Sequence, residues 1–135
     1  MASSIDWATL EDIPLIKKAA SKAVDELGFI GGWDFKEVIK KKHLLVDRDT
    51  GSFCHFHVRK DGVSVIYEIL TTPAARGTGL GRDMVQMLTR PVRAKCPLGL
   101  PSNGFYEKLG FRKVAVEEGK KRKLNVWELR DVWEE

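Results

Sequence analysis

The spacing of hydrophobic residues along the chain predicts an alternation of helices and strands. Between residues 10 and 26, apolar side chains recur every three or four positions, which places them on one face of a helix. Thr9 stands where a cap of the helix N-terminus is expected, and Gly28 stands where the helix would end. The same spacing over 34–42 predicts a second, shorter helix.

The remainder of the chain alternates short apolar runs with turn residues, a pattern typical of strands. The predicted elements are strands over 44–47, 52–59 and 63–71, a helix to about Leu88, a strand over 92–96, a helix over 102–109 closed by Gly110, and a hairpin of 111–117 with 124–129. Because 63–71 is apolar on both faces, we expect a central strand that is covered above and below. The pattern predicts an α/β protein with a mixed (α+β) sheet and helices on both of its faces.

The most distinctive chemical feature is the glycine-rich turn from Arg76 to Gly81, which precedes a predicted helix. Backbone N–H groups at the start of a helix face outward without partners, and the helix dipole adds positive potential, so such a turn suits a phosphate. The glycines alternate at 77, 79 and 81, which fits neither the P-loop spacing nor the dinucleotide fingerprint. A surface turn without a ligand is the alternative interpretation of this stretch.

Length and composition favour one globular domain, which we expect to span residues 1–135. The chain is 43% hydrophobic and 31% charged, as soluble proteins typically are. Cys54 and Cys96 form no Cys-x-x-Cys pair, so neither a zinc nor a redox motif is supported, and two cysteines fit a reducing compartment. Residues 1–30 show no signal-peptide pattern and no apolar run has the length of a membrane span, so we expect a cytoplasmic protein without membrane contact.

The net charge is +4, and basic residues cluster at 40–42 and 120–123. Nucleic-acid binding is one interpretation, because lysine and arginine neutralise phosphates. Acidic residues are interspersed and no basic stripe with aromatic residues appears, so we interpret the clusters as solvated ends of helices and hairpins. A basic nucleic-acid-binding module is kept as an alternative function.

Two segments resemble motifs of the GNAT superfamily of acyl-CoA-dependent N-acetyltransferases. Residues 67–82, with the sequence YEILTTPAARGTGLGR, are similar to its pyrophosphate-binding motif. Residues 102–111, SNGFYEKLGF, are similar to the downstream motif that ends in Phe-Tyr-x-Lys-x-Gly-Phe. Both occur in the order typical of the superfamily, and the compact length is similar to that of bacterial and bacteriophage members. The resemblance implies a GNAT-like fold with a mostly antiparallel central sheet, splayed between the fourth and fifth strands.

The resemblance also implies acetyl-CoA as the co-substrate. We expect no metal, because His55 and His57 lack a third ligand. Leu70 and Thr71 match the strand positions whose backbone pairs with the pantetheine arm and the thioester carbonyl. Asn103 lies near the position of a cofactor-contacting asparagine, and Tyr106 matches the tyrosine that protonates the departing CoA thiolate. The pyrophosphate would be held by the turn residues Arg76, Gly77, Thr78, Gly79, Leu80 and Gly81.

The implied activity is transfer of acetyl from acetyl-CoA to a primary amine by direct attack. Glu68 is the first candidate for the general base, and a structural ion pair is its alternative. His55, His57 and water are the other candidates for this role. The sequence names no acceptor, so a small molecule, a peptide and a protein all stay open, as does a homodimer. A catalytically inactive acyl-CoA-binding regulatory domain is a further alternative.

Overall fold

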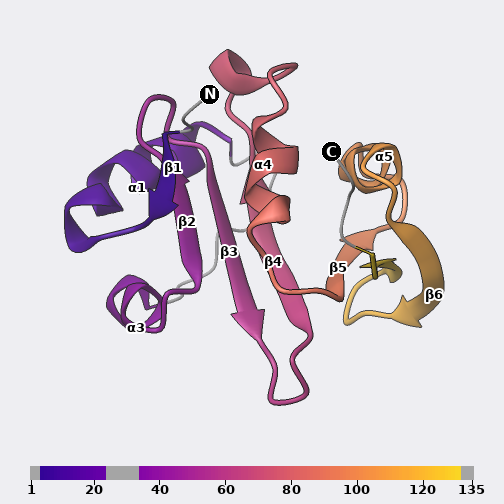
Figure 1. The fold of residues 1–135 in the computed structure, drawn as a ribbon. Coiled ribbons are helices and arrows are strands. Elements are labelled where there is room, and N and C mark those ends of the chain that lie inside the picture. The colour runs from indigo at the N-terminus through magenta and orange to yellow at the C-terminus, as the bar shows by residue number, and fades with distance from the viewer. Residues whose placement is uncertain (1–3, 24–33, 132–135) are drawn as a thin grey trace. The chain divides into compact units, whose positions relative to one another are not determined.

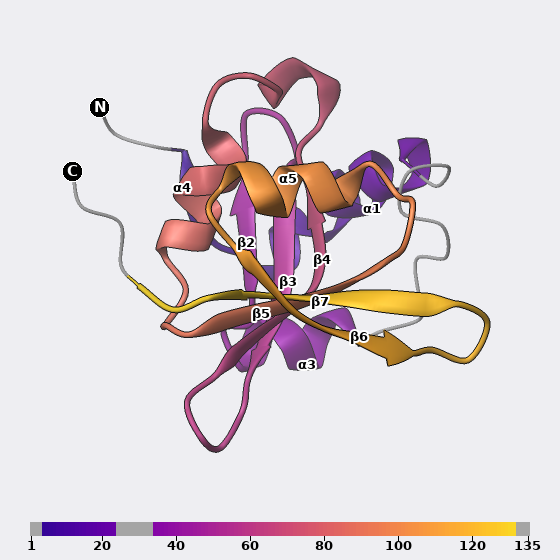
Figure 2. The same ribbon diagram turned by 90° about the vertical axis from the view of Figure 1, so that its right-hand side faces the viewer.

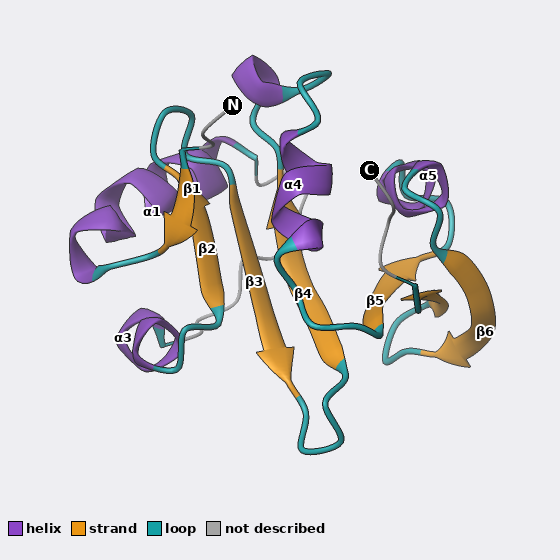
Figure 3. Cartoon of the chain, in the orientation of Figure 1, coloured by secondary structure: helices purple, strands orange, loops and turns teal. Residues whose placement is uncertain are grey.

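The computed structural model describes residues 4–23 and 34–131 of the chain. Its elements follow the alternation that the sequence predicts (Figures 1 and 3). In order they are β1 Ile5–Trp7, the 3-10 turn η1 Leu10–Asp12, α1 Ile13–Lys22, α3 Phe35–Lys40, β2 Leu44–Asp47, β3 Phe53–Val58, β4 Ser64–Leu70, the 3-10 turn η2 Pro73–Ala75, α4 Leu80–Gln86, β5 Val92–Pro97, α5 Ser102–Lys108, β6 Arg112–Glu118 and β7 Lys123–Leu129.

The strands form a seven-stranded sheet in the order β1-β2-β3-β4-β5-β7-β6. The pairs β1/β2, β2/β3, β5/β7 and β6/β7 are antiparallel. Strands β4 and β5 are parallel, with Ser64 opposite Val92 and Ile66 opposite Ala94. These pairings confirm the predicted mixed, mostly antiparallel sheet with 63–71 at a central position. Divergence of β4 and β5 beyond these pairs stays a prediction.

The residues group into two compact units, which we describe separately. The first consists of Met1–Phe56 and Glu68–Met87, and the second of His57–Tyr67 and Leu88–Glu135. Strands β3 and β4 each contribute residues to both units. The prediction of a single domain over 1–135 is not tested by this grouping.

The first unit is built on both faces of its strands. One face carries Leu44, Val46 and Phe53, which form a buried cluster with Ile16 and Ala20 of α1. The other face carries the side chains at the alternate positions of these strands. Met84 and Val85 of α4 are completely buried. Figure 2 shows α1 and α4 on opposite sides of β2, as the pattern of helices on both faces requires.

The second unit packs α5 against the hairpin-containing part of the sheet. Alternate residues of β5, namely Val92, Ala94 and Cys96, are buried. Strand β7 is buried from Asn125 to Leu129, whereas all of β6 is exposed at the edge of the sheet. This unit therefore has its core between β5, β7 and α5.

Most predicted boundaries agree with the structure within a few residues, and the differences have local causes. The helix expected over 10–26 begins as the 3-10 turn η1, and the expected end at Gly28 lies outside the described residues. Strand β1 was not predicted. Strand β4 is not covered along its whole length, because Tyr67 is 57% exposed. The described residues include no helix of the length and apolarity that a membrane span needs.

Strand β1 is held by Arg48, which follows β2. The Arg48 guanidinium donates from Nε and Nη2 to the two oxygens of Asp12 at 2.9 and 3.0 Å. It also donates to Asp6 at 3.0 Å and to the carbonyl oxygen of Trp7 at 3.3 Å. Asp12 in turn accepts the backbone N–H of Thr9 at 2.7 Å, which caps η1. One arginine thus joins β1, η1 and β2.

We expect Asp12→Asn to reduce stability in a pH-dependent way. The hydrogen bond from Arg48 is the main reason why the pKa of the buried Asp12 carboxyl lies below its ordinary 3.8. A carboxyl group whose pKa is lowered by folding stabilises the fold at pH values above its ordinary pKa. This contribution disappears as the pH falls through the lowered pKa. Urea unfolding at pH 7 should show a loss of about 1 to 3 kcal/mol, typical of hydrogen bonds to a charged group. A loss of the same size near pH 2 would contradict the role of the ionised carboxylate.

Candidate functional site

The glycine-rich turn leads from the end of β4 into α4, within the first unit. Gly79 is the N-cap residue of α4 with φ +83°, and no side chain caps the helix. Gly77 also has a positive φ, of +80°. Both conformations favour glycine because a Cβ would crowd the backbone. Glycine at positions 77 and 79 therefore allows the left-handed backbone conformations that form the turn.

The turn is open on the side where a ligand would approach. Apart from the neighbouring backbone, a Cβ placed on Gly77 or Gly79 would meet no atom within 4 Å. The first N–H groups of a helix have no acceptor within the helix, and here no capping side chain replaces one. Gly81, by contrast, is buried at the first turn of α4. Uncapped backbone donors at the start of a helix suit an oxyanion.

The start of the turn is fixed by hydrogen bonds within its own segment. Arg76 donates from Nε to the carbonyl oxygen of Thr71 at 3.3 Å. The N–H of Thr78 donates to the carbonyl oxygen of Ala75 at 3.2 Å, and its hydroxyl donates to the same oxygen. Thr78 thus has a structural role in shaping the turn.

A chain of hydroxyl groups connects this corner to the turn between β2 and β3. Thr72 is 9% exposed, and its hydroxyl lies 3.1 Å from that of Ser52. The N–H of Thr72 donates to the same Ser52 hydroxyl at 3.0 Å. Ser52 lies 2.8 Å from the Thr50 hydroxyl, which donates to the buried carboxylate of Asp47. The end of β4 is therefore anchored to the strand pair beside it.

The other predicted residues of β4 lie in the same unit. Leu70 is buried and is the last residue of β4, with Thr71 directly after it. Glu68 is half-buried on this strand. The structure thus brings the predicted general base, the strand positions and the turn together in one unit.

Asn103 lies in the second unit, where its amide makes four hydrogen bonds. Its Nδ2 donates to the carbonyl oxygens of Pro97 and Leu100 at 2.9 and 3.0 Å. Its Oδ1 accepts from Asn125 Nδ2 at 3.0 Å and from Trp127 Nε1 at 2.9 Å. An amide has two donor hydrogens and two acceptor lone pairs, so this side chain is fully used. It joins α5 to β5 and β7.

Tyr106 is 6% exposed and lies on α5 among aromatic rings. Its ring meets Phe105 and Phe111 edge-on, at centroid distances of 5.3 and 5.2 Å. It lies nearly parallel to Trp127 at 6.5 Å. These contacts fix the ring, so the direction of the hydroxyl is set by packing.

The remaining chemical candidates differ in environment. His55 is buried in the first unit, and His57 stacks on Tyr67 at 6.3 Å in the second. Burial raises the pKa of the Cys96 thiol, although Arg122 opposes the shift, so the thiol is a poor nucleophile. Within residues 4–23 and 34–131, no group of three or more histidine, cysteine, aspartate or glutamate residues could hold a metal ion.

A sequence model of the family described as FR47-like protein matches residues 45–119. This range is more than half of the chain, and it contains both the glycine turn and the Tyr106 segment. The chain belongs to the FR47-like family. No curated protein matches the sequence of this FR47-like chain.

Solved structures share the fold of the FR47-like chain at low sequence identity. Ard1 from Thermoplasma volcanium has a TM-score of 0.74 at 14% identity, covering 99% of this chain and 100% of its own. A GNAT family acetyltransferase from Bacillus cereus has a TM-score of 0.71 at 10% identity, covering 98% and 100%. A Bacillus anthracis protein named for streptothricin acetylation, in complex with acetyl coenzyme A, has a TM-score of 0.51 at 14% identity, covering 59% and 56%. The predicted GNAT superfamily membership and fold are confirmed.

The sequence did not reveal the polar residues that support these sites. Ser52 holds the corner after β4 of this FR47-like chain through Thr72, which lies 20 positions away, and Asp47 acts on it through Thr50. Asn125 and Trp127 hold Asn103 across a similar separation in the sequence.

The conformation of Gly79 predicts opposite effects of alanine at two glycines of the FR47-like chain. Gly79→Ala places a Cβ on a left-handed backbone and should lower the free energy of unfolding by about 1 to 2 kcal/mol. Gly104 is exposed within α5 and has open space around it, so Gly104→Ala should raise that free energy by about 0.5 to 1 kcal/mol. Urea unfolding of both variants measures the difference, and a stabilising Gly79→Ala would rule out the left-handed cap.

Proposed function

We propose that this chain transfers acetyl from acetyl-CoA to a primary amine by direct attack on the thioester. The observation that carries the proposal is the match of the FR47-like family over 45–119, because that range contains both predicted motifs in order. The acetyl-CoA complex of the Bacillus anthracis neighbour supports the identity of the donor. The acceptor can be a small molecule, a peptide or a protein.

The glycine turn is the proposed grip on the pyrophosphate. The N–H groups of Arg76 and Thr78 already donate to Pro73 and Ala75, so the grip would use the other backbone N–H groups of the turn and the open space beside Gly77 and Gly79. Leu70 and Thr71 are assigned to the pantetheine arm and the thioester carbonyl through their backbone. A carbonyl polarised by backbone N–H groups becomes more susceptible to attack. The assignment of Asn103 as a cofactor contact through its side chain requires exchange of one of its four existing hydrogen bonds.

The proposed reaction forms one bond and breaks another. The amine nitrogen bonds to the thioester carbonyl carbon, the carbon–sulfur bond breaks, and the electron pair of that bond leaves on sulfur. The nitrogen loses a proton to Glu68, His55, His57 or water, and the thiolate gains one from Tyr106. The chain contributes position and proton transfer, and no metal is assigned to the reaction.

Two other functions stay distinguishable by experiment. An acyl-CoA-binding regulatory domain would bind acetyl-CoA but release no free thiol with any amine. A nucleic-acid-binding module would bind through its lysines with strong salt dependence. Some of these lysines have acidic neighbours, since Lys41 lies 3.9 Å from Glu37 and Lys123 lies 3.9 Å from Glu118. We therefore favour acetyl transfer.

We expect Gly79→Asp to weaken acetyl-CoA binding by tenfold or more. Its carboxylate would enter the open space of the turn and repel a pyrophosphate there. Gly79→Ala is the matched control, because it strains the same φ without adding charge, and it should lose less affinity. Calorimetric titration of both variants measures the dissociation constants. Equal affinity of Gly79→Asp and the wild type would exclude the turn as the pyrophosphate site.

We expect Tyr106→Phe to lower kcat by about 10²-fold, as loss of a general acid does. The phenylalanine ring keeps the contacts with Phe105, Phe111 and Trp127, so stability should change little. Release of free CoA thiol at saturating substrates measures the rate, and calorimetry checks that acetyl-CoA affinity is unchanged. A rate close to that of the wild type would assign the proton to water or to another group.

A further inference from the structure

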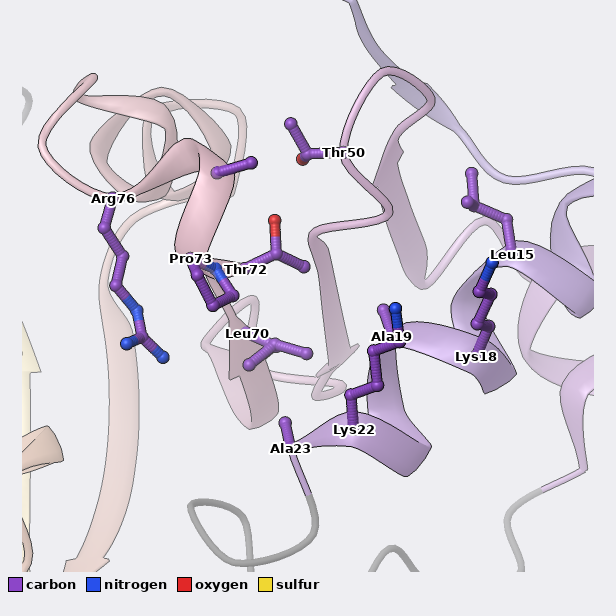
Figure 4. A pocket seen from close by; sticks show the side chains of 11 residues that line it. Leu15, Lys18, Ala19, Lys22, Ala23, Thr50, Leu70, Thr72, Pro73 and Arg76 are labelled. Carbon is purple, nitrogen blue, oxygen red and sulfur yellow. The ribbon is translucent and has the colours of Figure 1, made fainter.

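The first unit contains a pocket of about 430 Å³ beside the glycine turn. This volume falls within the range of small-molecule sites. Figure 4 shows α1 on one side of the pocket and the segment from Leu70 to Arg76 on the other. Thr50, from the turn between β2 and β3, completes the lining.

Within the described residues, the charge of the lining has a single sign. Lys18, Lys22 and Arg76 line the pocket, and among residues 4–23 and 34–131 no aspartate or glutamate does. Most of the remaining surface is apolar, and the residues that provide it are Leu15, Ala19, Ala23, Leu70, Pro73 and Ala74. A cavity of this composition favours a ligand with an apolar body and a negatively charged group.

The two lysines of α1 face the pocket together. Lys18 and Lys22 are separated by four positions, so their side chains lie on the same face of the helix. Like charges at this spacing destabilise a helix slightly. In the described part of the chain, neither ammonium group forms an ion pair. The helix dipole stabilises the charge of Lys22 in the last turn of α1 but does not extend to Lys18. An anion in the pocket would stabilise the charges of both lysines.

The hydroxyl chain gives the pocket a hydrogen-bond acceptor. Thr50 donates its proton to Asp47, so Ser52 must donate to Thr50, and Thr72 must donate to Ser52. Thr72 lines the pocket, and its hydroxyl oxygen keeps its lone pairs, since its own proton is already committed. It can therefore accept a hydrogen bond from an N–H group of a bound amine.

We infer that this pocket binds the acyl acceptor, and that the acceptor is an amine with a carboxylate or phosphate group on a partly apolar body. Lys18 and Lys22 bind the anionic group, and Thr72 receives the amine. The inference rests on the proposed function, because Leu70 lines the pocket and its backbone is assigned to the thioester arm. An amine in the pocket is then next to the carbonyl carbon that it attacks.

The test compares amines that differ only in the anionic group. One pair is phenylalanine and phenylalaninamide, and the other is O-phosphoethanolamine and ethanolamine, so the two pairs separate carboxylate from phosphate. Acetyl transfer is followed by free CoA thiol, and binding of each amine to the protein with CoA present is followed by calorimetry. We expect the anionic member of at least one pair to be preferred by tenfold or more in both measurements.

The variant Lys18→Gln/Lys22→Gln should reduce this preference at least tenfold, through KM rather than kcat. It should leave the neutral amine within twofold of the wild type. Lys36→Gln/Lys40→Gln is the matched control, because these exposed lysines have the same four-residue spacing on α3 and do not line the pocket. The control should behave as the wild type does.

Failure of the inference and failure of the proposed function give different results. If acetyl-CoA binds but no anionic amine is preferred in transfer or binding, the pocket assignment is overturned and the proposed donor site stands. The same holds if the preference survives in Lys18→Gln/Lys22→Gln. If acetyl-CoA does not bind to the wild type, the proposed function is overturned, and the acceptor role of the pocket is overturned with it.

Discussion

The hydrogen-bond chain from Asp47 to Thr72 is the constraint on which the first unit depends. It passes through the hydroxyls of Thr50 and Ser52 and joins the turn after β2 to the residue that precedes η2. Ser52 is completely buried, so each hydroxyl needs its partner, and removing one would leave others unsatisfied. The corner where β4 ends and the glycine turn begins is therefore fixed from the side of β2 and β3.

The same turn also determines how closely α1 approaches the sheet. Gly51 has φ +81°, and a Cβ on it would lie 3.3 Å from the Cβ of Ala19 and from Leu15. A larger residue would thus meet both a strained backbone and the helix. Because Ala19 and Leu15 also line the pocket, the packing of a glycine against α1 contributes to the width of the cavity. The contacts that pack α1 against this turn thus also shape the pocket that we infer to bind the acceptor.

Helices and strands with a clear hydrophobic periodicity could be predicted from the sequence. Sites formed by residues that are far apart in the sequence could not. The helices over 34–42 and 102–109 have apolar faces of their own, and the structure has them at α3 and α5. Asp34 caps the first, and Gly110 with a positive φ follows the second. Strand β1 has only three residues and depends on Arg48, more than 40 positions away, so no local pattern indicates it. The glycine turn was visible because its chemistry lies in consecutive residues. The pocket was not, since Lys18 and Arg76 become neighbours of one cavity only through folding.

The extent of the family match suggests how donor and acceptor recognition are divided. Residues 45–119 include the glycine turn and the strand end that we assign to acetyl-CoA. Helix α1, with Lys18 and Lys22, lies before this range. The proposed donor site would use backbone N–H groups, which impose few requirements on side chains, whereas the inferred acceptor site would use charges that single substitutions can change. Under this proposal the lysines of α1 can be substituted without disturbing the turn that is assigned to the cofactor, so a common donor is compatible with a chain-specific acceptor.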